Sequence, residues 1–398
     1  MDPVRNPFAP GAGSQPPELA GRDHIIRDAE IALQRILHGR HGRSQLLLGL
    51  RGVGKTVLLN RIEQVADANH HLTSFIEAPE NTTLAELLYP RMAQVLRRLS
   101  AIESAKANAH SALRALRSFA SVFKIKLAGV SISVDAETGV ADSGMLELDL
   151  AEVFLRIGEA AKSAGRAWTL LIDEVQYLKS DELAALIVAI HRINQRQLPV
   201  MFFGAGLPQL AALSGEAKSY AERLFNFPAI GPLDPDAART AIVQPIVDEG
   251  ESIADDAVAR ILKETQGYPY YLQEWGFQSW NLAEQSPITV DVVDAATQAA
   301  LTRLDQGFFR VRYDRLTPKE REYVVAMAGL GSGPYRSADV ADALGEEITA
   351  LGPRRAKIIS KGMIYSPAYG DIDFTVPLFD EFLRRITTPT PLKPNGGE

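Results

Sequence analysis

The chain has 398 residues, 46% of them hydrophobic and 23% charged, with a formal net charge of -7 at pH 7. This is the composition of a globular protein long enough for two or three domains, and its negative charge argues against a protein that coats nucleic acid, although it leaves room for a local basic patch. The absence of cysteine excludes disulfides, thiolate metal sites and cysteine nucleophiles, and it suits a reducing cytoplasm.

The sequence does not predict a signal peptide or a membrane-spanning segment. The N-terminus lacks a basic region followed by an apolar one, so we do not expect a signal peptide, and the sequence contains no run of about 18 apolar residues. We therefore expect a cytoplasmic protein without a membrane partner. Residues 1–17, rich in proline, glycine and alanine, predict an extended arm, and residues 387–398 predict a disordered tail.

Apolar runs alternate with amphipathic segments through residues 18–232. The runs are short and apolar on both faces, as expected for strands buried beneath helices, and the amphipathic segments have helical periodicity. This alternation predicts an α/β domain with a parallel sheet. The predicted strands span 44–50, 72–78, 168–174 and 198–206, and the predicted helices span 24–38, 55–67, 83–99, 147–164 and 180–196.

One segment interrupts this alternation. Residues 123–144 have a period of two around Gly129 and predict a β-hairpin inserted before the third strand. Such a hairpin could contact DNA or a partner, extend the sheet or form an oligomer contact. His70 and His71 begin the second strand without the spacing of a metal site, and we expect both at the surface.

The pattern changes twice in the second half of the chain. Residues 233–305 contain helical patterns only, and residues 306–386 contain three short helices followed by two strands around a glycine turn, which is the layout of a winged helix. The helices predicted in the first of these segments span 235–249, 254–265, 268–283 and 289–304.

A glycine-rich loop follows the first predicted strand. Its residues fit the pattern G-x-x-x-x-G-K-[ST] between a strand and a helix, the context that supports a phosphate-binding loop. Main-chain N–H groups at the helix N-terminus would bind phosphates, with Lys55 on the β- and γ-phosphates of ATP and Thr56 on Mg²⁺. The predicted binding residues are Gly49, Arg51, Gly52, Val53, Gly54, Lys55, Thr56 and Val57.

Two adjacent carboxylates end the third predicted strand, in the sequence LLIDE. Acids at the end of a buried strand are costly unless a cation lies near them. We therefore predict that Asp173 supports Mg²⁺ and that Glu174 polarises the attacking water. Alone, the two acids could equally cap the helix that follows, but the phosphate loop favours the catalytic interpretation.

With these motifs the chain resembles the AAA+ ATPases, in the branch that includes archaeal and bacterial AAA ATPases, origin-recognition proteins and the signalling ATPases called STAND. The resemblance extends from about Pro17 to Arg385. It implies a P-loop NTPase core, a lid at 233–305 with Pro269 beside the adenine, and Arg223 as an arginine finger toward a neighbouring subunit of an ATP-bound homo-oligomer. An ordinary surface arginine is the alternative for Arg223.

Two places depart from the family pattern. The fourth strand ends in Gly204, Ala205 and Gly206, where the family usually has a polar residue that orients the attacking water. Tyr270 and Tyr271 occupy the region in which origin-recognition proteins have an arginine. Both departures favour a nucleotide-dependent switch with slow hydrolysis over a processive motor.

The predicted winged helix offers a nucleic-acid surface, because its third helix carries Arg354, Arg355, Lys357 and Lys361. Against this, residues 311–386 contain 11 basic and 11 acidic side chains, and acids near the wing would repel phosphates. Two functions stay open: an ATP-dependent switch that binds duplex DNA, and a STAND-like regulatory ATPase whose C-terminal domain binds a protein.

Overall fold

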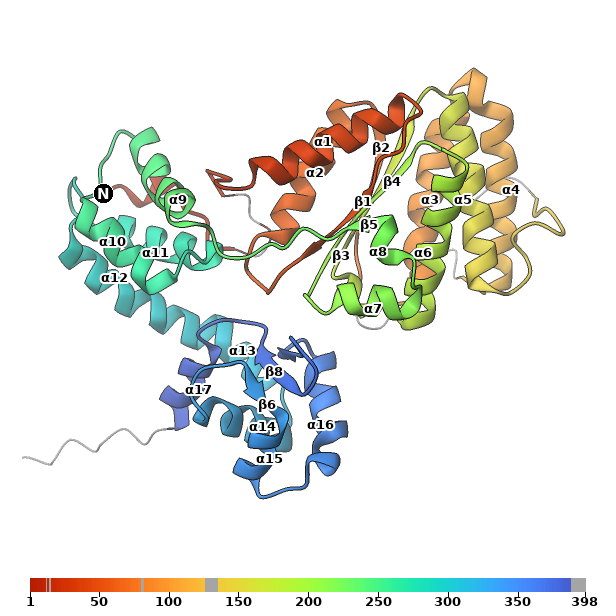
Figure 1. Cartoon of the computed structure of the whole chain (residues 1–398). Coiled ribbons are helices and arrows are strands. Elements are labelled where there is room, and N and C mark those ends of the chain that lie inside the picture. Colours follow the sequence, from red (N-terminus) through yellow and green to blue (C-terminus); the bar gives the residue numbers. More distant parts are fainter. Residues whose placement is uncertain (12, 14–15, 80–81, 126–134, 388–398) are drawn as a thin grey trace, which may run out of the picture. The chain divides into compact units, whose positions relative to one another are not determined.

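The chain divides into two compact units in the computed structural model, which describes all residues except 12, 14–15, 80–81, 126–134 and 388–398 (Figure 1). We call the first the sheet unit, which comprises Gly11–Ala241 and Tyr268–Tyr270. The second, the helical unit, comprises Met1–Pro10, Ile242–Gly267 and Tyr271–Glu398. Nearly all of the predicted disordered tail lies outside the described residues.

The sheet unit is built on a parallel sheet with the strand order β2-β3-β4-β1-β5 among the described residues. The predicted α/β architecture and its four strands are confirmed. The edge strand β5 has only two residues and no hydrophobic pattern that could have revealed it. The strands are β1 Ser44–Leu48, β2 His71–Glu77, β3 Ala167–Asp173, β4 Val200–Gly206 and β5 Phe225–Asn226.

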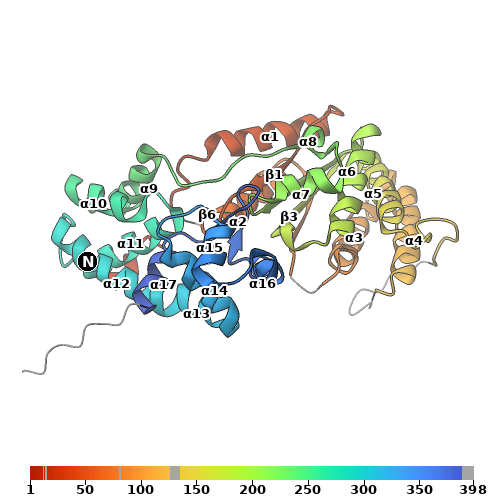
Figure 2. The same ribbon diagram turned by 60° about the horizontal axis from the view of Figure 1, so that its bottom comes forward.

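Helices cover both faces of this sheet (Figure 1). Helices α1 and α2 lie on one face and α3, α5 and α6 on the other, while α4 forms an outer layer on α3 and α5 (Figure 2). Strands covered on both sides require the continuous apolar runs seen in the sequence. The helices span α1 Asp23–Leu37, α2 Lys55–Ala68, α3 Leu84–Ser100, α4 Lys106–Val122, α5 Leu146–Ser163, α6 Ser180–Gln195, α7 Leu210–Ala217 and α8 Ala221–Leu224.

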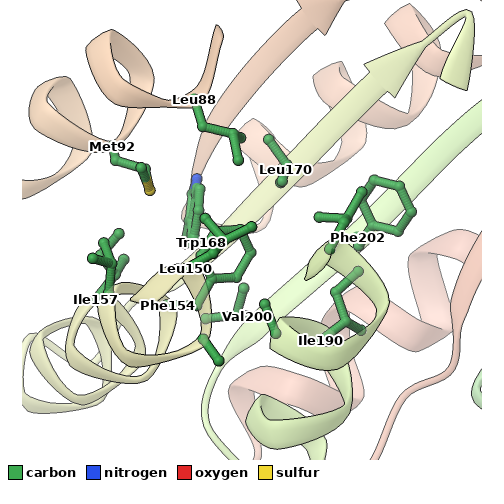
Figure 3. Close-up of a cluster of buried hydrophobic side chains, with 14 of the residues drawn as sticks. Leu88, Met92, Leu150, Phe154, Ile157, Trp168, Leu170, Ile190, Val200 and Phe202 are labelled. Carbon is green, nitrogen blue, oxygen red and sulfur yellow. The ribbon is translucent and has the colours of Figure 1, made fainter. Parts of the chain in front are cut away.

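The main core lies between the sheet and helices α3, α5 and α6 (Figure 3). Trp168 on β3 is fully buried and packs edge-on against Phe154 of α5, with 4.9 Å between the ring centroids. Its indole N–H donates to Ser74 Oγ on β2 at 3.1 Å. A large aromatic side chain thus joins two strands to a covering helix without leaving its polar atom unpaired.

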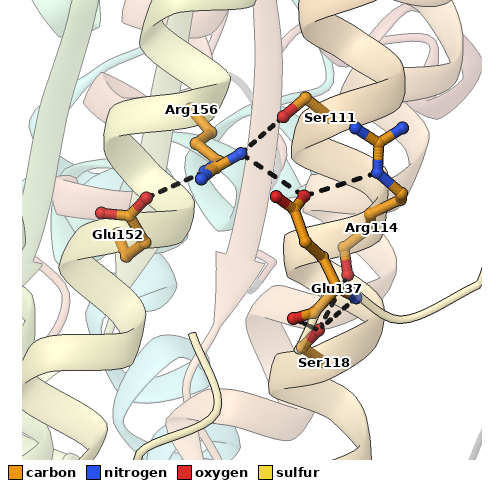
Figure 4. A network of polar contacts seen from close by, with 6 residues as sticks. All are labelled: Ser111, Arg114, Ser118, Glu137, Glu152 and Arg156. Carbon is orange, nitrogen blue, oxygen red and sulfur yellow. Dashed lines mark hydrogen bonds and ion pairs between the residues drawn. The ribbon is translucent and has the colours of Figure 1, made fainter. Parts of the chain in front are cut away.

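The segment predicted as an inserted hairpin differs from expectation where it is described. Residues 123–125 and 135–144 contain no strand, and residues 126–134 lie outside the described residues. The returning chain is anchored by Glu137, whose carboxylate lies between Arg114 of α4 and Arg156 of α5, at 3.4 and 3.6 Å (Figure 4). Ser118 Oγ also donates to Glu137 O and accepts from its N–H.

The N-terminal arm is not a simple extended segment, because its first ten residues pack within the helical unit. A short 3₁₀ turn, η1, spans Pro3–Arg5. Phe8 is 2% exposed and covers Gly276, where an added Cβ would lie 2.6 Å from the phenyl ring. The Trp280 indole N–H donates to Asp2 O. The proline-rich composition concealed an aromatic anchor, which now explains why a glycine lies inside a helix.

The four helices predicted for residues 233–305 are present, and two of them, α9 and α11, begin in the sheet unit and continue in the helical unit. Trp275 is fully buried, and its N–H donates to Thr297 Oγ1 at 3.0 Å. The helices span α9 Pro235–Asp248, α10 Asp255–Thr265, α11 Pro269–Leu282 and α12 Val290–Arg303. A π-helix, η4 Leu304–Phe309, then continues α12 toward the C-terminal part.

The C-terminal part has the three predicted helices, α14, α15 and α16, and a small antiparallel sheet with the order β6-β8-β7. Aromatic rings that include Phe309, Phe379 and Phe382 form its core. No helix within the described ranges is long and apolar enough to span a membrane. The elements span α13 Arg310–Asp314, α14 Pro318–Gly329, β6 Tyr335–Arg336, α15 Ser337–Leu344, α16 Ile348–Ser360, β7 Ile364–Tyr365, β8 Asp371–Phe374 and α17 Phe379–Thr387.

Candidate nucleotide-binding site

The glycines of the predicted phosphate loop are required for different reasons. At Gly49, a Cβ would lie 2.2 Å from Ile230 O, so the chain itself leaves no room for a side chain. Gly52 and Gly54 have φ values of 84° and 92°, which favour glycine. Gly54 has nothing within 4 Å of an added Cβ. Open space in front of the loop is therefore found at Gly54, whereas Gly49 serves the packing of the loop.

Helix α2 begins directly after this loop, at Lys55. Its N-cap is Gly54, which has no side chain to cap the first main-chain N–H groups. Those groups have no partner within the helix, and they carry the positive end of the helix dipole. The start of α2 thus has a geometry that can bind an anion, and phosphate binding there stays a prediction.

The side chain of Lys55 folds back against the loop that precedes it, and Lys55 is only 6% exposed. Its ammonium donates to Gly49 O at 3.0 Å and to Leu50 O at 2.9 Å. Burial lowers the pKa of this ammonium, against the attraction of Glu174 and Asp173. A cation held in a buried position beside two acids gains stability from any further negative charge placed near it.

Thr56 and Asp173 are 117 positions apart in sequence, and the fold brings them into contact. Thr56 Oγ1 donates to Asp173 Oδ2 at 2.5 Å. Asp173 is 3% exposed at the end of β3, and burial raises its pKa, against the hydrogen bond from Thr56. The hydroxyl and the carboxylate are hard oxygen donors of the kind that Mg²⁺ prefers.

The arrangement fits a metal ion that is bound together with a nucleotide. Across the described residues, no cluster of three or more His, Cys, Asp or Glu side chains is placed to hold a metal. An ion at Thr56 and Asp173 would therefore need further ligands from phosphate and water, and this is the usual coordination of Mg²⁺ in nucleotide sites.

Glu174 follows Asp173 in the left-handed conformation, with φ 55° and ψ 38°. Its N–H donates to Asp173 Oδ1 at 2.8 Å. This turn starts the 3₁₀ helix η3 Val175–Tyr177 and directs the two adjacent carboxylates to different partners. Gln176 on η3 donates from Nε2 to Glu174 Oε2, a contact that the sequence did not predict.

Arg51 connects the phosphate loop to two other segments. Its guanidinium donates to the Tyr177 hydroxyl on η3, and its carbonyl accepts from the Tyr268 hydroxyl. Tyr270 N donates to Gly52 O at 3.2 Å. Pro269, predicted beside the adenine, thus belongs to a short segment that contacts the loop through the residues on either side of it. The sequence analysis singled out neither Tyr177 nor Tyr268.

Two other predicted binding residues, Val53 and Val57, differ in exposure. Val53 is 2% exposed and packs against the Gly49 position, whereas Val57 is half-buried on the first turn of α2. Arg223 is exposed on α8, immediately before the edge strand β5. None of the contacts described above for the phosphate loop and the acid pair involves Arg223.

The predicted nucleic-acid residues of α16 are mostly engaged within their own domain. Arg354 binds Glu346 through both terminal nitrogens, at 3.0 and 3.1 Å. Arg355 donates to Ser337 Oγ at 2.8 Å. Lys361 contacts the buried carboxylate of Glu320 at 2.6 Å. Lys357 is the exposed residue of the four.

Comparison with known proteins identifies the two parts of the chain separately. Residues 18–203 match the family model of the AAA ATPase domain, and residues 306–383 match a domain of unknown function, DUF8462. No curated protein matches the chain. Among solved structures, a Walker-type ATPase of Pyrococcus abyssi is similar, with 16% identity, a TM-score of 0.56, and coverage of 92% of this chain and 96% of that one.

Two further solved structures are similar at lower scores. The RuvB Holliday junction branch migration motor of Thermotoga maritima has 16% identity and a TM-score of 0.47 over 91% of this chain and 95% of that one. The Orc1 protein of Aeropyrum pernix, solved in complex with DNA, has 15% identity and a TM-score of 0.44 over 96% of both chains. At such identities, the likeness to the Pyrococcus protein concerns the fold alone. Residues 18–203, which contain most of the parallel sheet, the phosphate loop and the acid pair, match the AAA ATPase domain, and the sheet unit has the P-loop NTPase fold.

Proposed function

We propose that the protein is a nucleotide-dependent switch that binds ATP with Mg²⁺ and hydrolyses it slowly. The contact between Thr56 and Asp173, at 2.5 Å, carries this proposal because it joins the phosphate loop to the acid pair. Thr56 and Asp173 would hold Mg²⁺, which neutralises charge on the phosphates when bound. Lys55 would exchange its bonds to the loop carbonyls for bonds to phosphate oxygens.

Glu174 is the proposed general base. In this step a water oxygen forms a bond to the γ-phosphorus, and a water proton passes to the Glu174 carboxylate. The bond between the γ-phosphorus and its bridging oxygen breaks, and ADP leaves with the electron pair. The left-handed turn at Glu174 supports this role, since it separates this carboxylate from Asp173, which faces Thr56.

Slow turnover is proposed because β4 ends without a polar side chain. Gly204, Ala205 and Gly206 present only main-chain groups where a donor could orient water, and the segment that opens α11 has tyrosines but no arginine. General-base catalysis depends on placing the base and the water together. A site with fewer positioning groups suits a protein whose bound nucleotide sets its state for long periods.

Two variants test this proposal with purified full-length protein. Lys55→Ala should abolish ATP binding in calorimetry, because it removes the buried cation of the loop. Glu174→Gln should bind ATP with the affinity of the unchanged protein and should lower hydrolysis by roughly 100-fold or more. Arg196→Ala, at an exposed arginine after α6, serves as the control. Normal hydrolysis by Glu174→Gln would overturn the assignment of the base.

We also propose that the C-terminal domain is a winged helix that binds a protein partner, as in the STAND-like alternative. The contacts of Arg354, Arg355 and Lys361 within the domain support this choice over DNA. A cation already paired with a carboxylate must give up that bond to reach a phosphate, and this offsets the gain from counterion release. Lys357, together with Arg355, whose partner Ser337 is neutral, offers too little charge for tight binding to a duplex.

Duplex binding is the outcome that would overturn the choice of a protein partner. Fluorescence anisotropy with a labelled duplex, measured at several salt concentrations, should show weak binding that Lys357→Glu does not change. Lys319→Glu, at an exposed lysine on α14, is the matched charge control. Tight binding that falls steeply with salt, and that is lost in Lys357→Glu but kept in Lys319→Glu, would restore the DNA-associated function.

Arg223 is proposed as an arginine finger that acts on the nucleotide of a neighbouring subunit in an ATP-bound oligomer. Its exposure beside the edge strand β5 of the sheet unit supports action between subunits, since an exposed arginine can reach a second chain. An arginine supplied in this way stabilises charge that develops on the transferred phosphoryl group.

A further inference from the structure

The end of β4 has no room for the polar side chain that it lacks. At Gly204, an added Cβ would lie 2.5 Å from Leu46 and 2.9 Å from Phe202. At Gly206, it would lie 2.6 Å from Gln176 Oε1. The glycine at 206 therefore admits the side chain of a different element, η3, to the place where a residue of β4 would otherwise project.

Gln176 makes two hydrogen bonds with opposite ends of its amide. Leu207 N, at the end of β4, donates to Gln176 Oε1 at 3.1 Å. Nε2 of the same amide donates to Glu174 Oε2. A main-chain N–H can bond only to the oxygen of the amide, so the contact with Leu207 determines that the NH₂ group faces Glu174.

We propose that Gln176 is a positioning residue for hydrolysis: its amide, held by Leu207 N at the end of β4, orients the Glu174 carboxylate. The inference rests on the proposed role of Glu174 as general base. With one carboxylate oxygen held by Nε2, the other oxygen is left to accept the proton of the attacking water. A carboxylate that rotates freely would meet the water in the right geometry less often.

This role requires an amide at position 176, because an amide has both an acceptor and a donor. A glutamate at 176 would have the same shape and would still accept from Leu207 N, but it would present an oxygen to Glu174 instead of a donor. An alanine would remove both hydrogen bonds. Because the site also contains Lys55 and Asp173, whose charges interact, an added carboxylate should disturb Glu174 more than an empty space does.

The first test compares steady-state ATP hydrolysis with ATP affinity in full-length variants. Gln176→Ala should lower kcat roughly 10-fold and Gln176→Glu roughly 100-fold, within the range that a general base supplies, with the ATP affinity changed less than 2-fold in both. Gln195→Glu, an exposed position in the last turn of α6, is the matched control. A residue that served packing alone would tolerate the glutamate of equal size, so a normal kcat in Gln176→Glu would overturn the proposal.

The second test uses Gly206→Ala, whose Cβ would displace the amide from the opposite side. Gly206→Ala and Gln176→Ala should each lower kcat, and the double variant should be no slower than the slower single variant, because both changes remove one interaction. Effects that multiply would contradict the proposal. Glu174→Gln distinguishes the role of Gln176 from the role of Glu174. If Glu174→Gln is inactive while Gln176→Glu is fully active, only the role of Gln176 fails. If Glu174→Gln remains active, the assignment of Glu174 as general base fails.

Discussion

Lowering the pH from 7.5 to 5 should destabilise the sheet unit through one buried imidazole, that of His71. The sequence suggested a pair of surface histidines, and this is wrong for His71, which is 3% exposed at the start of β2. Its Nδ1 lies 2.7 Å from Thr169 Oγ1 on β3, and its Nε2 lies 3.3 Å from Leu33 O on α1. His70, one position earlier, is exposed.

Burial lowers the pKa of His71 from 6.5 to about 4, against the carbonyl of Leu33 and the charge of Asp67, which raise it. The unfolded chain therefore binds a proton at a higher pH than the folded chain does. The stability contributed by the neutral imidazole is complete above pH 6.5 and is lost as the pH falls from 6.5 toward 4. Between pH 7.5 and 5, one such group changes the free energy of unfolding by about 2 kcal/mol.

Chemical denaturation at both pH values measures this change. His71→Gln keeps an amide that can bond to Thr169 but removes the titration. The quantity to compare is the difference in unfolding free energy between pH 7.5 and pH 5 within each protein, since any constant cost of the substitution cancels. The difference should be about 2 kcal/mol smaller in His71→Gln. Equal pH dependence in the two proteins would refute the reasoning, because it would mean that the imidazole titrates normally in the folded state.

Two further predictions concern the arm and the subunit contact. Phe8→Ala should lower the unfolding free energy of the helical unit by about 3–5 kcal/mol, seen in thermal denaturation, whereas Val4→Ala, at a residue 92% exposed, should have no effect; equal melting of all three proteins would contradict the anchoring role. Arg223→Ala should hydrolyse ATP more slowly than the unchanged protein does. Mixing it with Lys55→Ala subunits should restore part of the activity, because those subunits still carry Arg223. No recovery on mixing would argue against action between subunits.

The sequence predicted most of the elements, and the reasons are local. The four long strands are continuous apolar runs, and helices such as α3 and α14 begin at capping boxes formed by a threonine and a glutamate three residues later. The two-residue strands β5 and β6 have no comparable pattern, because a short edge strand depends on the neighbour with which it pairs. The packing of the proline-rich arm was not predicted for a similar reason. Its anchor, Phe8, packs on Gly276, and this contact between distant residues exists only in the folded chain.

In the candidate site too, some features could be predicted from the sequence and others depend on the fold. The phosphate loop and the acid pair each occupy a few consecutive residues, so their chemistry could be predicted from residue types and spacing. Their contact, from Thr56 to Asp173, required the strand order, which places β4 between β1 and β3. For the basic residues of α16, the sequence showed the positive charge but not the carboxylates that pair with two of them.

By itself, then, the sequence determined most of the strands and helices and predicted which loop binds a phosphate chain, since both depend on neighbouring residues along the chain. Only the tertiary structure decided which side chains share a hydrogen bond. Gln176 is near Glu174 in sequence, but its amide is oriented by Leu207, 31 residues away. Hydrogen bonds act over about 3 Å, and such proximity between distant residues exists only after the sheet has formed.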